Sequence, residues 1–197
     1  MDQSIGISSG NPQLDQYLEL LPIGLVKHLV RSYNKAIELA TLHDVDTKKA
    51  GLAALCHDIA RNIKGDELQR LATTYGLQIH PLENIHTILL HGPVGAEMLS
   101  DCFGINDVEV LEAVRWHTTF NHGLSPIAKV TYLADKLDIN KAHRFSDMAG
   151  KNLLARNHMD RAILAFLEEE ISSILSIGKE VHPAAIQGRD ALRDLIY

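Results

Sequence analysis

The amino-acid sequence predicts an all-α protein that folds as a bundle of helices. Apolar residues recur three and four positions apart along most of the chain, which is the spacing of one helix face. Capping residues followed by proline, as at Asn11-Pro12 and Ser125-Pro126, mark helix starts, and glycines such as Gly76 mark helix ends. No stretch shows the alternation of apolar and polar residues that is typical of a half-buried strand.

The helices of the N-terminal half follow from their caps, breaks and apolar strips. Residues 1–10 are small and polar and are expected to be flexible. Pro22 ends the first helix, and two apolar strips on the second predict burial around much of its circumference. The polar turn 43–47 and the break at Lys64-Gly65 bound the third helix. The predicted helices of this half cover residues 12–21, 23–42, 48–61 and 66–75.

The C-terminal half continues the helical pattern after Pro81 restarts the chain. The segment 139–157 is polar and basic, and we assign no helix to it. A last long helix carries Ile163 and Ile174 and ends at Gly178, and only a short tail is expected after Pro183. The other predicted helices of this half cover residues 94–103, 108–117 and 126–137.

Composition and charge exclude several classes of protein. A chain of 197 residues with 46% hydrophobic residues fits one soluble domain, which we expect to span residues 11–197. The net charge of −6 opposes a broad nucleic-acid-binding surface. No apolar run approaches the roughly 18 residues that span a membrane, and no signal peptide is evident. Cys56 and Cys102 lie in apolar stretches, so we expect buried free thiols in a cytoplasmic protein without nucleic-acid or membrane partners.

Histidine is abundant, with 11 residues, and several histidines and aspartates interrupt apolar helices. The apolar run 53–56 leads directly into His57 and Asp58, and Asp135 follows an apolar run in the same way. Burying such a group without a partner costs about 1–3 kcal/mol. In a single His-Asp pair, the imidazole could hydrogen-bond to a backbone carbonyl and the carboxylate could be solvated. A bound metal ion would instead satisfy the whole set of histidines and aspartates. The residues of this kind are His28, His57, Asp58, His117 and Asp135, with His86 and His91 between them.

Imidazole and carboxylate groups suit iron, manganese, zinc or nickel, and the interior of a helical bundle brings such ligands together from facing helices. A structural zinc site would more often use cysteine thiolates. The sequence therefore predicts a metal site between helices. Asp58 is free to bridge toward a second ion or to hold a water molecule.

The order of these residues resembles that of a known superfamily. His28, then His57-Asp58, then Asp135 resembles the HD superfamily of metal-dependent phosphohydrolases. Longer stretches are similar to the YqeK family, bacterial HD proteins that hydrolyse diadenosine tetraphosphate symmetrically to ADP. The resemblance covers about residues 22–178 and implies a single-domain helical bundle of the HD type. The matching stretches are 53–60, 91–96, 113–118 and 129–136.

The resemblance also implies roles for single residues. It implies one or two divalent or trivalent ions, iron above all, with manganese, nickel, zinc, cobalt and magnesium as alternatives. The implied metal ligands are His28, His57, Asp58 and Asp135. A second metal or a substrate phosphate would contact His86, His91 and His117, and further phosphate contacts would come from Arg61, Thr118 and Lys141. Catalysis would rest on Asp58, His91 and His117, which orient the attacking water and neutralise charge on the phosphate.

Two positions depart from the family pattern. Leu25 stands where the family commonly has a basic residue, one helical turn before the first metal histidine. Residues 138–141 read Asp-Ile-Asn-Lys where the family usually has Glu-Pro-x-Arg. Lys141 keeps the positive charge but lacks the two-pronged guanidinium that grips phosphate. Nucleotide specificity is therefore the property that these departures affect.

Three functions follow as hypotheses. The first is the symmetrical hydrolysis of diadenosine tetraphosphate, a small-molecule substrate. The second keeps the metal site but acts on a nucleoside mono-, di- or triphosphate or on a guanosine alarmone, and Leu25 and Lys141 favour it. The third is a non-catalytic sensor of metal and nucleotide, and the intact set of histidines and aspartates opposes it. A homodimer is compatible with all three.

Overall fold

The computed structural model describes residues 6–197, which form α-helices, two short 3-10 helices and connecting loops, without a strand. The all-α prediction is confirmed for this part of the chain. Residues 1–5 of the segment expected to be flexible lie outside the described residues. Further along that segment, Ser8 and Ser9 hydrogen-bond to the carboxylate of Asp15. In chain order the helices are α1 (Pro12–Glu19), α2 (Ile23–Leu42), α3 (Thr47–Cys56), α4 (Gly65–Thr74), α5 (Pro81–Ile85), η1 (Thr87–Leu90), α6 (His91–Phe103), α7 (Val108–Trp116), α8 (Pro126–Lys136), η2 (Ile139–Arg144), α9 (Met148–Asn157), α10 (Met159–Ser176) and α11 (Pro183–Ile196).

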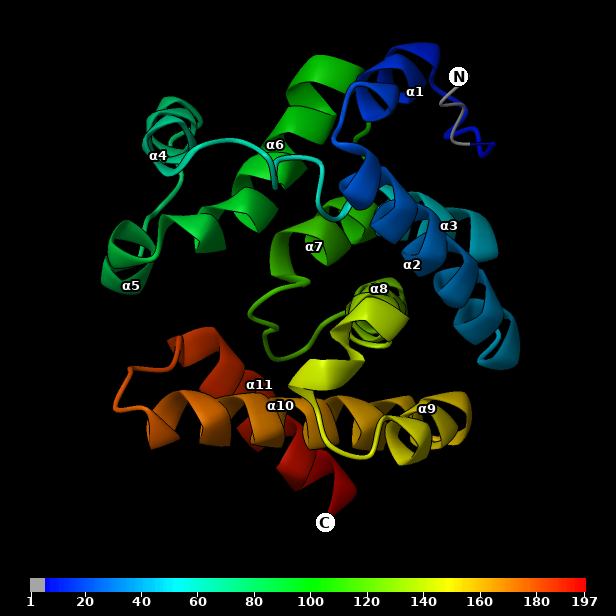
Figure 1. Cartoon of the computed structure of the whole chain (residues 1–197), viewed down its shortest axis with the longest axis vertical. Coiled ribbons are helices and arrows are strands. Elements are labelled where there is room, and N and C mark those ends of the chain that lie inside the picture. The colour runs from blue at the N-terminus through cyan, green and yellow to red at the C-terminus, as the bar shows by residue number, and fades with distance from the viewer. Residues whose placement is uncertain (1–5) are drawn as a thin grey trace.

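Helix α8 lies at the centre of the molecule and packs against α2, α3, α7 and α10 (Figure 1). Nearly every residue from Ile127 to Lys136 is buried. A helix that is buried around its whole circumference needs neighbours on all sides, and these four helices provide them. The central position of α8 carries Asp135, near its C-terminal end, into the interior.

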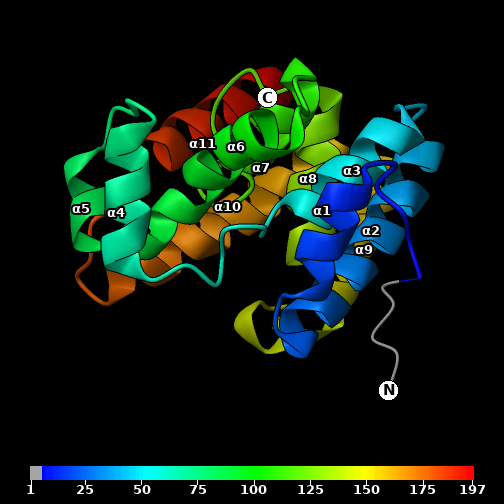
Figure 2. The same ribbon diagram turned by 90° about the horizontal axis from the view of Figure 1, so that it is seen from above.

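The remaining helices surround α8 in distinct groups. Helices α9, α10 and α11 form a layer on one side of it, and α4 and α5 lie at the far end of the molecule from α2 and α3 (Figures 1 and 2). Two hydrophobic clusters result, and α3 contributes to both, with Ala53 in one and Cys56 in the other. His57 follows Cys56 directly, so it enters the interior where the two clusters meet.

Gly92 allows the close approach of α6 to α7. A Cβ atom at Gly92 would lie 2.7 Å from the backbone oxygen of Arg115 and 3.1 Å from that of Val114. Any other residue would clash with these backbone atoms, so only glycine permits this separation of the two helices. The close contact matters for the site because it brings His91, the first residue of α6, toward His117, the C-cap of α7.

Several helix bounds differ from those predicted. Helix α3 ends at Cys56, and the chain continues through hydrogen-bonded turns over residues 57–62 instead of extending the helix to residue 61. Helix α6 begins at His91, because Pro93 sits in its first turn, where no intrahelical N–H bond is lost. Besides the short helices α5, η1 and η2, the longer helices α9 and α11 were not predicted. Asp147 caps α9 within the polar segment, and His182 with Pro183 starts α11 in the expected tail.

The two cysteines have different environments. Cys56 is a buried free thiol as predicted, and burial raises its pKa. Cys102 is exposed, which contradicts the sequence prediction, because it lies in the last turn of α6 on the side that faces solvent. Among the described residues, none of the helices is long and apolar enough to cross a membrane.

Candidate metal centre

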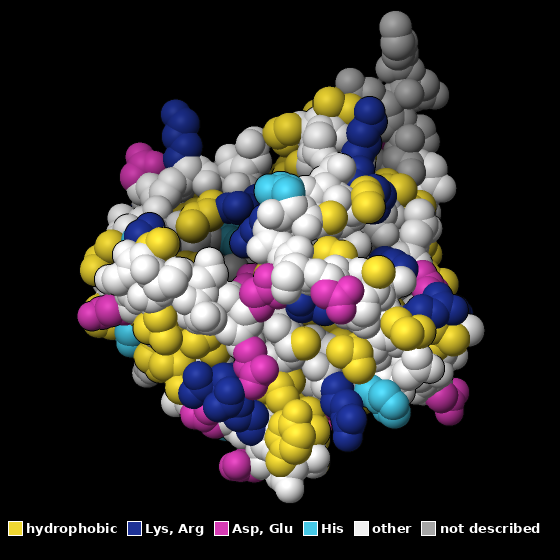
Figure 3. Space-filling view, turned by 60° about the horizontal axis from the view of Figure 1, so that its bottom comes forward, with side chains coloured by type: hydrophobic (Ala, Val, Ile, Leu, Met, Phe, Trp, Pro, Cys, Tyr) yellow, Lys and Arg dark blue, Asp and Glu magenta, His cyan; other side chains and the backbone are white. Residues whose placement is uncertain are grey.

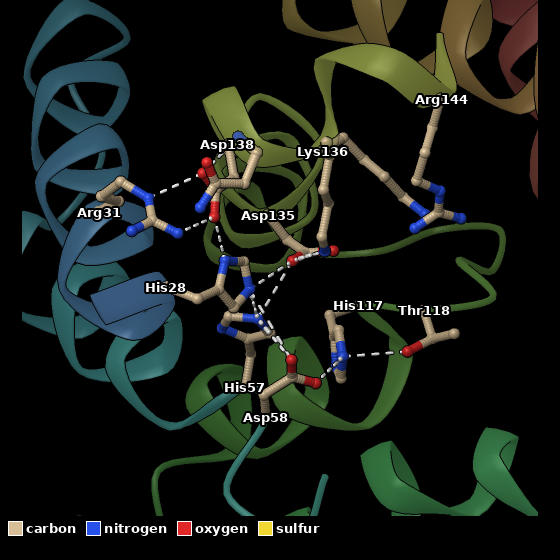
Figure 4. Close-up of polar contacts among 12 residues, drawn as sticks. His28, Arg31, His57, Asp58, His117, Thr118, Asp135, Lys136, Asp138 and Arg144 are labelled. Atoms are coloured by element: carbon tan, nitrogen blue, oxygen red, sulfur yellow. Dashed lines mark hydrogen bonds and ion pairs between the residues drawn. The ribbon is translucent and has the colours of Figure 1, made fainter. Parts of the chain in front are cut away.

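Four residues from three parts of the chain form the first group, defined as His28, His57, Asp58 and Asp135. His28 lies within α2, His57 is the C-cap of α3, and Asp135 belongs to α8. The Nε2 atoms of His28 and His57 lie 3.0 and 3.2 Å from Asp135 Oδ1. They lie 3.7 and 3.6 Å from Asp58 Oδ2. Two imidazoles and two carboxylates therefore converge on one point (Figure 4).

Asp58, His91 and His117 form a second group beside the first. The Nε2 atoms of His91 and His117 lie 2.9 and 3.3 Å from Asp58 Oδ1. Asp58 thus presents Oδ2 to the first group and Oδ1 to the second, which is the arrangement of a carboxylate that bridges two sites. That Asp58 bridges toward a second ion stays a prediction.

The hydrogen bonds of the imidazoles fix their tautomers. Nδ1 of His57, His91 and His117 contacts the backbone oxygen of Ala54, Ile88 and Val114 respectively. Because a carbonyl oxygen only accepts, each Nδ1 donates a proton, and the neutral ring then carries a lone pair on Nε2. His28 Nδ1 donates to the Asp138 carboxylate with the same consequence.

In their neutral forms the four rings would direct Nε2 lone pairs at one another and at carboxylate oxygens. His28 Nε2 lies 3.1 Å from His57 Nε2, and His91 Nε2 lies 2.9 Å from His117 Nε2. Acceptors at these distances repel one another unless a cation or a proton lies between them. The six residues of the two groups are at most 8% exposed, so solvent does not relieve this repulsion. The donor set therefore fits metal ions, with carboxylate and imidazole ligands suited to iron, manganese, zinc or nickel.

Charges in the site favour ionised carboxylates. Burial alone would raise the pKa of Asp58, but His57, His117 and His91 outweigh it and hold that pKa well below its usual range. Burial likewise opposes ionisation of Asp135, yet Lys141, His28 and His57 hold its pKa well below the usual value. Burial lowers the pKa of His117 to about 4, assisted by the neighbouring His57 and His91. His117 is therefore neutral at physiological pH, the form that binds metal.

A cavity of about 510 Å³ is lined by residues of both groups, namely Asp58, His91, His117 and Asp135. Figure 3 shows a hollow bordered by basic side chains on the surface of the molecule. Apolar residues of α10, including Leu167, Ile171 and Ile174, form a further part of the cavity wall. Basic side chains also line the cavity, and these are Arg61, Lys136, Lys141, Arg144 and Lys179.

The predicted site residues differ in how closely they approach the two groups. Thr118 Oγ1 lies 2.9 Å from His117 Nε2 and 3.2 Å from His91 Nε2, and Lys141 Nζ contacts Asp135 Oδ1. Arg61 and His86 line the cavity, but among the described residues neither forms a hydrogen bond or ion pair with either group. Leu25 is half-buried against the apolar cluster that also contains Leu29.

Several residues of the site were not predicted. Asp138 and Arg31 lie behind His28, on the side away from the cavity (Figure 4). Asp138 lies between the apolar Leu137 and Ile139 but follows no apolar run, so the signal that identified Asp58 and Asp135 did not identify it. On the cavity wall, Lys136 pairs with Glu170 at 2.6 Å. Glu170 belongs to α10, and no pattern in the sequence connected that helix with the site.

This all-helical fold, with adjacent histidine and aspartate residues in a convergent ligand set, defines a class of hydrolases built on the HD domain. Residues 25–140 match the HD domain family model, and the chain belongs to the HD-domain family.

Curated relatives and a solved structure agree with this family. The chain is 31% identical to the "Bis(5'-nucleosyl)-tetraphosphatase, symmetrical" of Bacillus subtilis over 79% of its own length and 82% of that protein. It is also 31% identical to a protein of the same name from Halalkalibacterium halodurans, over 80% and 82% of the two chains. A crystal structure from Clostridium acetobutylicum, described as a predicted HD superfamily hydrolase involved in NAD metabolism, aligns with a TM-score of 0.82 at 27% identity. That alignment covers 86% of this chain and 88% of the other.

Proposed function

We propose that this chain is a metal-dependent hydrolase that cleaves diadenosine tetraphosphate symmetrically to two ADP molecules. The observation that carries this proposal is the pair of His/Asp groups that share Asp58 beside a cavity with basic and apolar walls. The names of the two relatives at 31% identity support the choice of substrate.

In this proposal His28, His57, Asp58 and Asp135 hold one metal ion, with iron as the leading choice. His91 and His117, together with Asp58, hold a second ion or contact a substrate phosphate. When bound, a metal ion supplies a Lewis acid for the phosphate oxygens and lowers the pKa of water to near 7 in favourable sites. The supporting geometry is the convergence of the Nε2 atoms of four histidines and the carboxylate oxygens of Asp58 and Asp135.

The reaction adds one water molecule across the central phosphoanhydride bond. The oxygen of water attacks one of the two inner phosphorus atoms, and the bridging oxygen leaves with the other ADP. Asp58 is placed to orient the water, because its carboxylate is buried and faces the cavity, and the proton released from the water passes to solvent. ADP is a good leaving group, so the step needs no strong general acid.

Basic residues of the cavity would neutralise the four phosphates. Lys141 lies beside Asp135 at the first group, and Arg61 lies on the cavity wall. Each charge-assisted hydrogen bond to phosphate contributes about 1.5–3 kcal/mol. The apolar part of the wall, formed by Leu167, Ile171 and Ile174, offers a surface for a nucleoside. A cavity of about 510 Å³ falls in the range of small-molecule sites.

The test is hydrolysis of diadenosine tetraphosphate by the full chain, purified without oxygen and loaded with iron. Products are separated by ion-exchange chromatography, and bound metal is assayed in the same sample. We expect two ADP per substrate and, in water labelled with ¹⁸O, one labelled ADP of the two. Formation of ATP and AMP would contradict symmetrical cleavage. Turnover of a guanosine alarmone or nucleoside triphosphate, with none of diadenosine tetraphosphate, would contradict the proposed substrate.

A further inference from the structure

His28 differs from the other three histidines of the two groups in what holds its ring. His57, His91 and His117 each donate Nδ1–H to the carbonyl of the residue three positions earlier. Each lies at a helix boundary: His57 and His117 are C-caps, and His91 follows η1. At the ends of α3 and α7 the last carbonyl oxygens have no helical N–H partner and remain free to accept. The backbone oxygen of Ile88 in η1 accepts both the backbone N–H and the Nδ1–H of His91.

His28 does not lie at a helix end, so it has no such terminal carbonyl oxygen beside it. His28 lies well inside α2, which runs from Ile23 to Leu42. The carbonyl oxygens in a helix interior accept the N–H groups four residues later and are already used. The Nδ1–H of His28 finds its acceptor in another part of the chain. Asp138, 110 residues away in sequence, supplies its carboxylate oxygen Oδ2.

The Asp138 carboxylate is itself held in place. Arg31, one turn after His28 on α2, donates from Nε to Oδ1 and from Nη2 to Oδ2, both at 2.8 Å. The Asp138 side chain is only 1% exposed. The Arg31 guanidinium supplies the opposite charge beside this buried carboxylate. Asp138 is thus a buried, charged acceptor with a fixed orientation.

Asp138 also begins the segment that carries Lys141. It is the N-cap of η2, and its Oδ1 accepts from the backbone N–H of Asn140 at 3.0 Å. Its backbone oxygen accepts from the N–H of Lys141 at 2.8 Å. One residue therefore connects a ring of the first group with the segment whose lysine contacts Asp135.

We propose that Asp138 is a positioning residue of the metal centre. Its carboxylate, clamped by Arg31, holds the His28 ring so that the Nε2 lone pair faces the first group. A charged acceptor on the second nitrogen also makes an imidazole a stronger ligand than a carbonyl acceptor does, and such partners typically change metal affinity by about 10–100-fold. The inference rests on metal binding at the first group and requires no particular substrate.

The test is a titration of the metal-free full chain with Co²⁺, without nucleotide, followed by the absorption spectrum of the bound ion. Asp138→Asn keeps the side-chain shape but removes the charge, and we expect Co²⁺ affinity to fall at least 10-fold. Asp138→Ala is expected to lower it further. The matched control is Asp46→Asn, because Asp46 also caps a helix but contacts no histidine, and its affinity should equal that of the original chain. Circular dichroism verifies that every variant is folded.

A double-mutant cycle shows whether Asp138 acts through His28. In a His28→Ala background, adding Asp138→Asn should change the Co²⁺ affinity less than twofold, because the ring that Asp138 positions is absent. An Asp138→Asn affinity within twofold of the original chain would overturn the proposal. An equal loss with and without His28 would also overturn it, as would an original chain that binds no Co²⁺. Failure to hydrolyse diadenosine tetraphosphate, with these affinities as expected, would contradict only the proposed function.

Discussion

At the scale of single residues, the site depends on which atom of each side chain is free. The imidazoles donate Nδ1–H to fixed acceptors and leave Nε2 for a ligand, and Asp58 divides its two oxygens between the two groups. A buried site built in this way has little freedom to rearrange, because every ring is anchored on its far side. Substitution of one of these residues is therefore expected to affect chemistry more than folding.

Asp58 provides the most direct test at this scale. Asp58→Asn removes the charge that both groups share, so we expect hydrolysis to fall at least 1,000-fold, roughly the loss of 4 kcal/mol of transition-state stabilisation. The far-ultraviolet circular dichroism should remain that of a helical protein. Asp66→Asn, at an exposed position of α4, is the control and should retain full activity. Appreciable hydrolysis by Asp58→Asn would contradict the assigned role.

Substitutions of Lys141 test how its departure from the family pattern affects substrate binding. Lys141→Met removes the ammonium group that contacts Asp135, so the KM for diadenosine tetraphosphate should rise about 10–100-fold, as expected for one charge-assisted hydrogen bond. Lys141→Arg restores a guanidinium and should keep the KM at or below that of the original chain. Steady-state kinetics with both variants measures the effect. An unchanged KM in Lys141→Met would remove Lys141 from the substrate contacts.

At the scale of helices, the site exists because helix ends meet in the interior. His57 and His117 are C-caps, His91 begins α6, and Asp135 lies near the end of α8. Helix ends leave carbonyl groups without intrahelical partners, and the imidazoles use these carbonyls to fix their orientation. The separation of α6 from α7 is equally important, because it sets the distance between His91 and His117.

Substitution of Gly92 tests the contact between α6 and α7. Gly92→Ala places a Cβ atom 2.7 Å from the backbone oxygen of Arg115, which cannot move as a flexible side chain would. We expect a loss of about 1–3 kcal/mol in the free energy of unfolding, measured by urea denaturation. Gly24→Ala is the matched control in α2, where a Cβ meets no atom within 4 Å. That change should be neutral or stabilising, by up to about 1 kcal/mol.

At the scale of the whole molecule, the centre joins segments that are far apart in sequence. Residues of α2, α3, α6, α7 and α8 converge on the two groups, and α10 closes the cavity from the layer below. A ligand bound at this junction contacts most of the fold at once. Its removal is therefore expected to weaken the entire domain and not one helix alone.

Removal of metal should accordingly lower the stability of the whole chain. With free metal at about 100 times its Kd, binding to the native state stabilises it by about 2.7 kcal/mol. A chelator such as EDTA should thus lower the Tm by several degrees in a single cooperative transition, measured by circular dichroism. Re-addition of the ion should restore the Tm. A His28→Ala/Asp58→Asn variant should show little response to the chelator, which separates metal loss from other effects of EDTA.

The sequence by itself determined the helical class and identified most residues of the two groups. The periodicity of apolar residues predicts a helix from its own local spacing, and His57-Asp58 and Asp135 stand out because each interrupts an apolar run. Only the tertiary structure decided what lies behind and around them. Asp138 and Arg31 became part of the site because His28 lacks a free carbonyl nearby, and α10 and α11 became its wall. These contacts join residues more than 100 positions apart, and no local pattern encodes them.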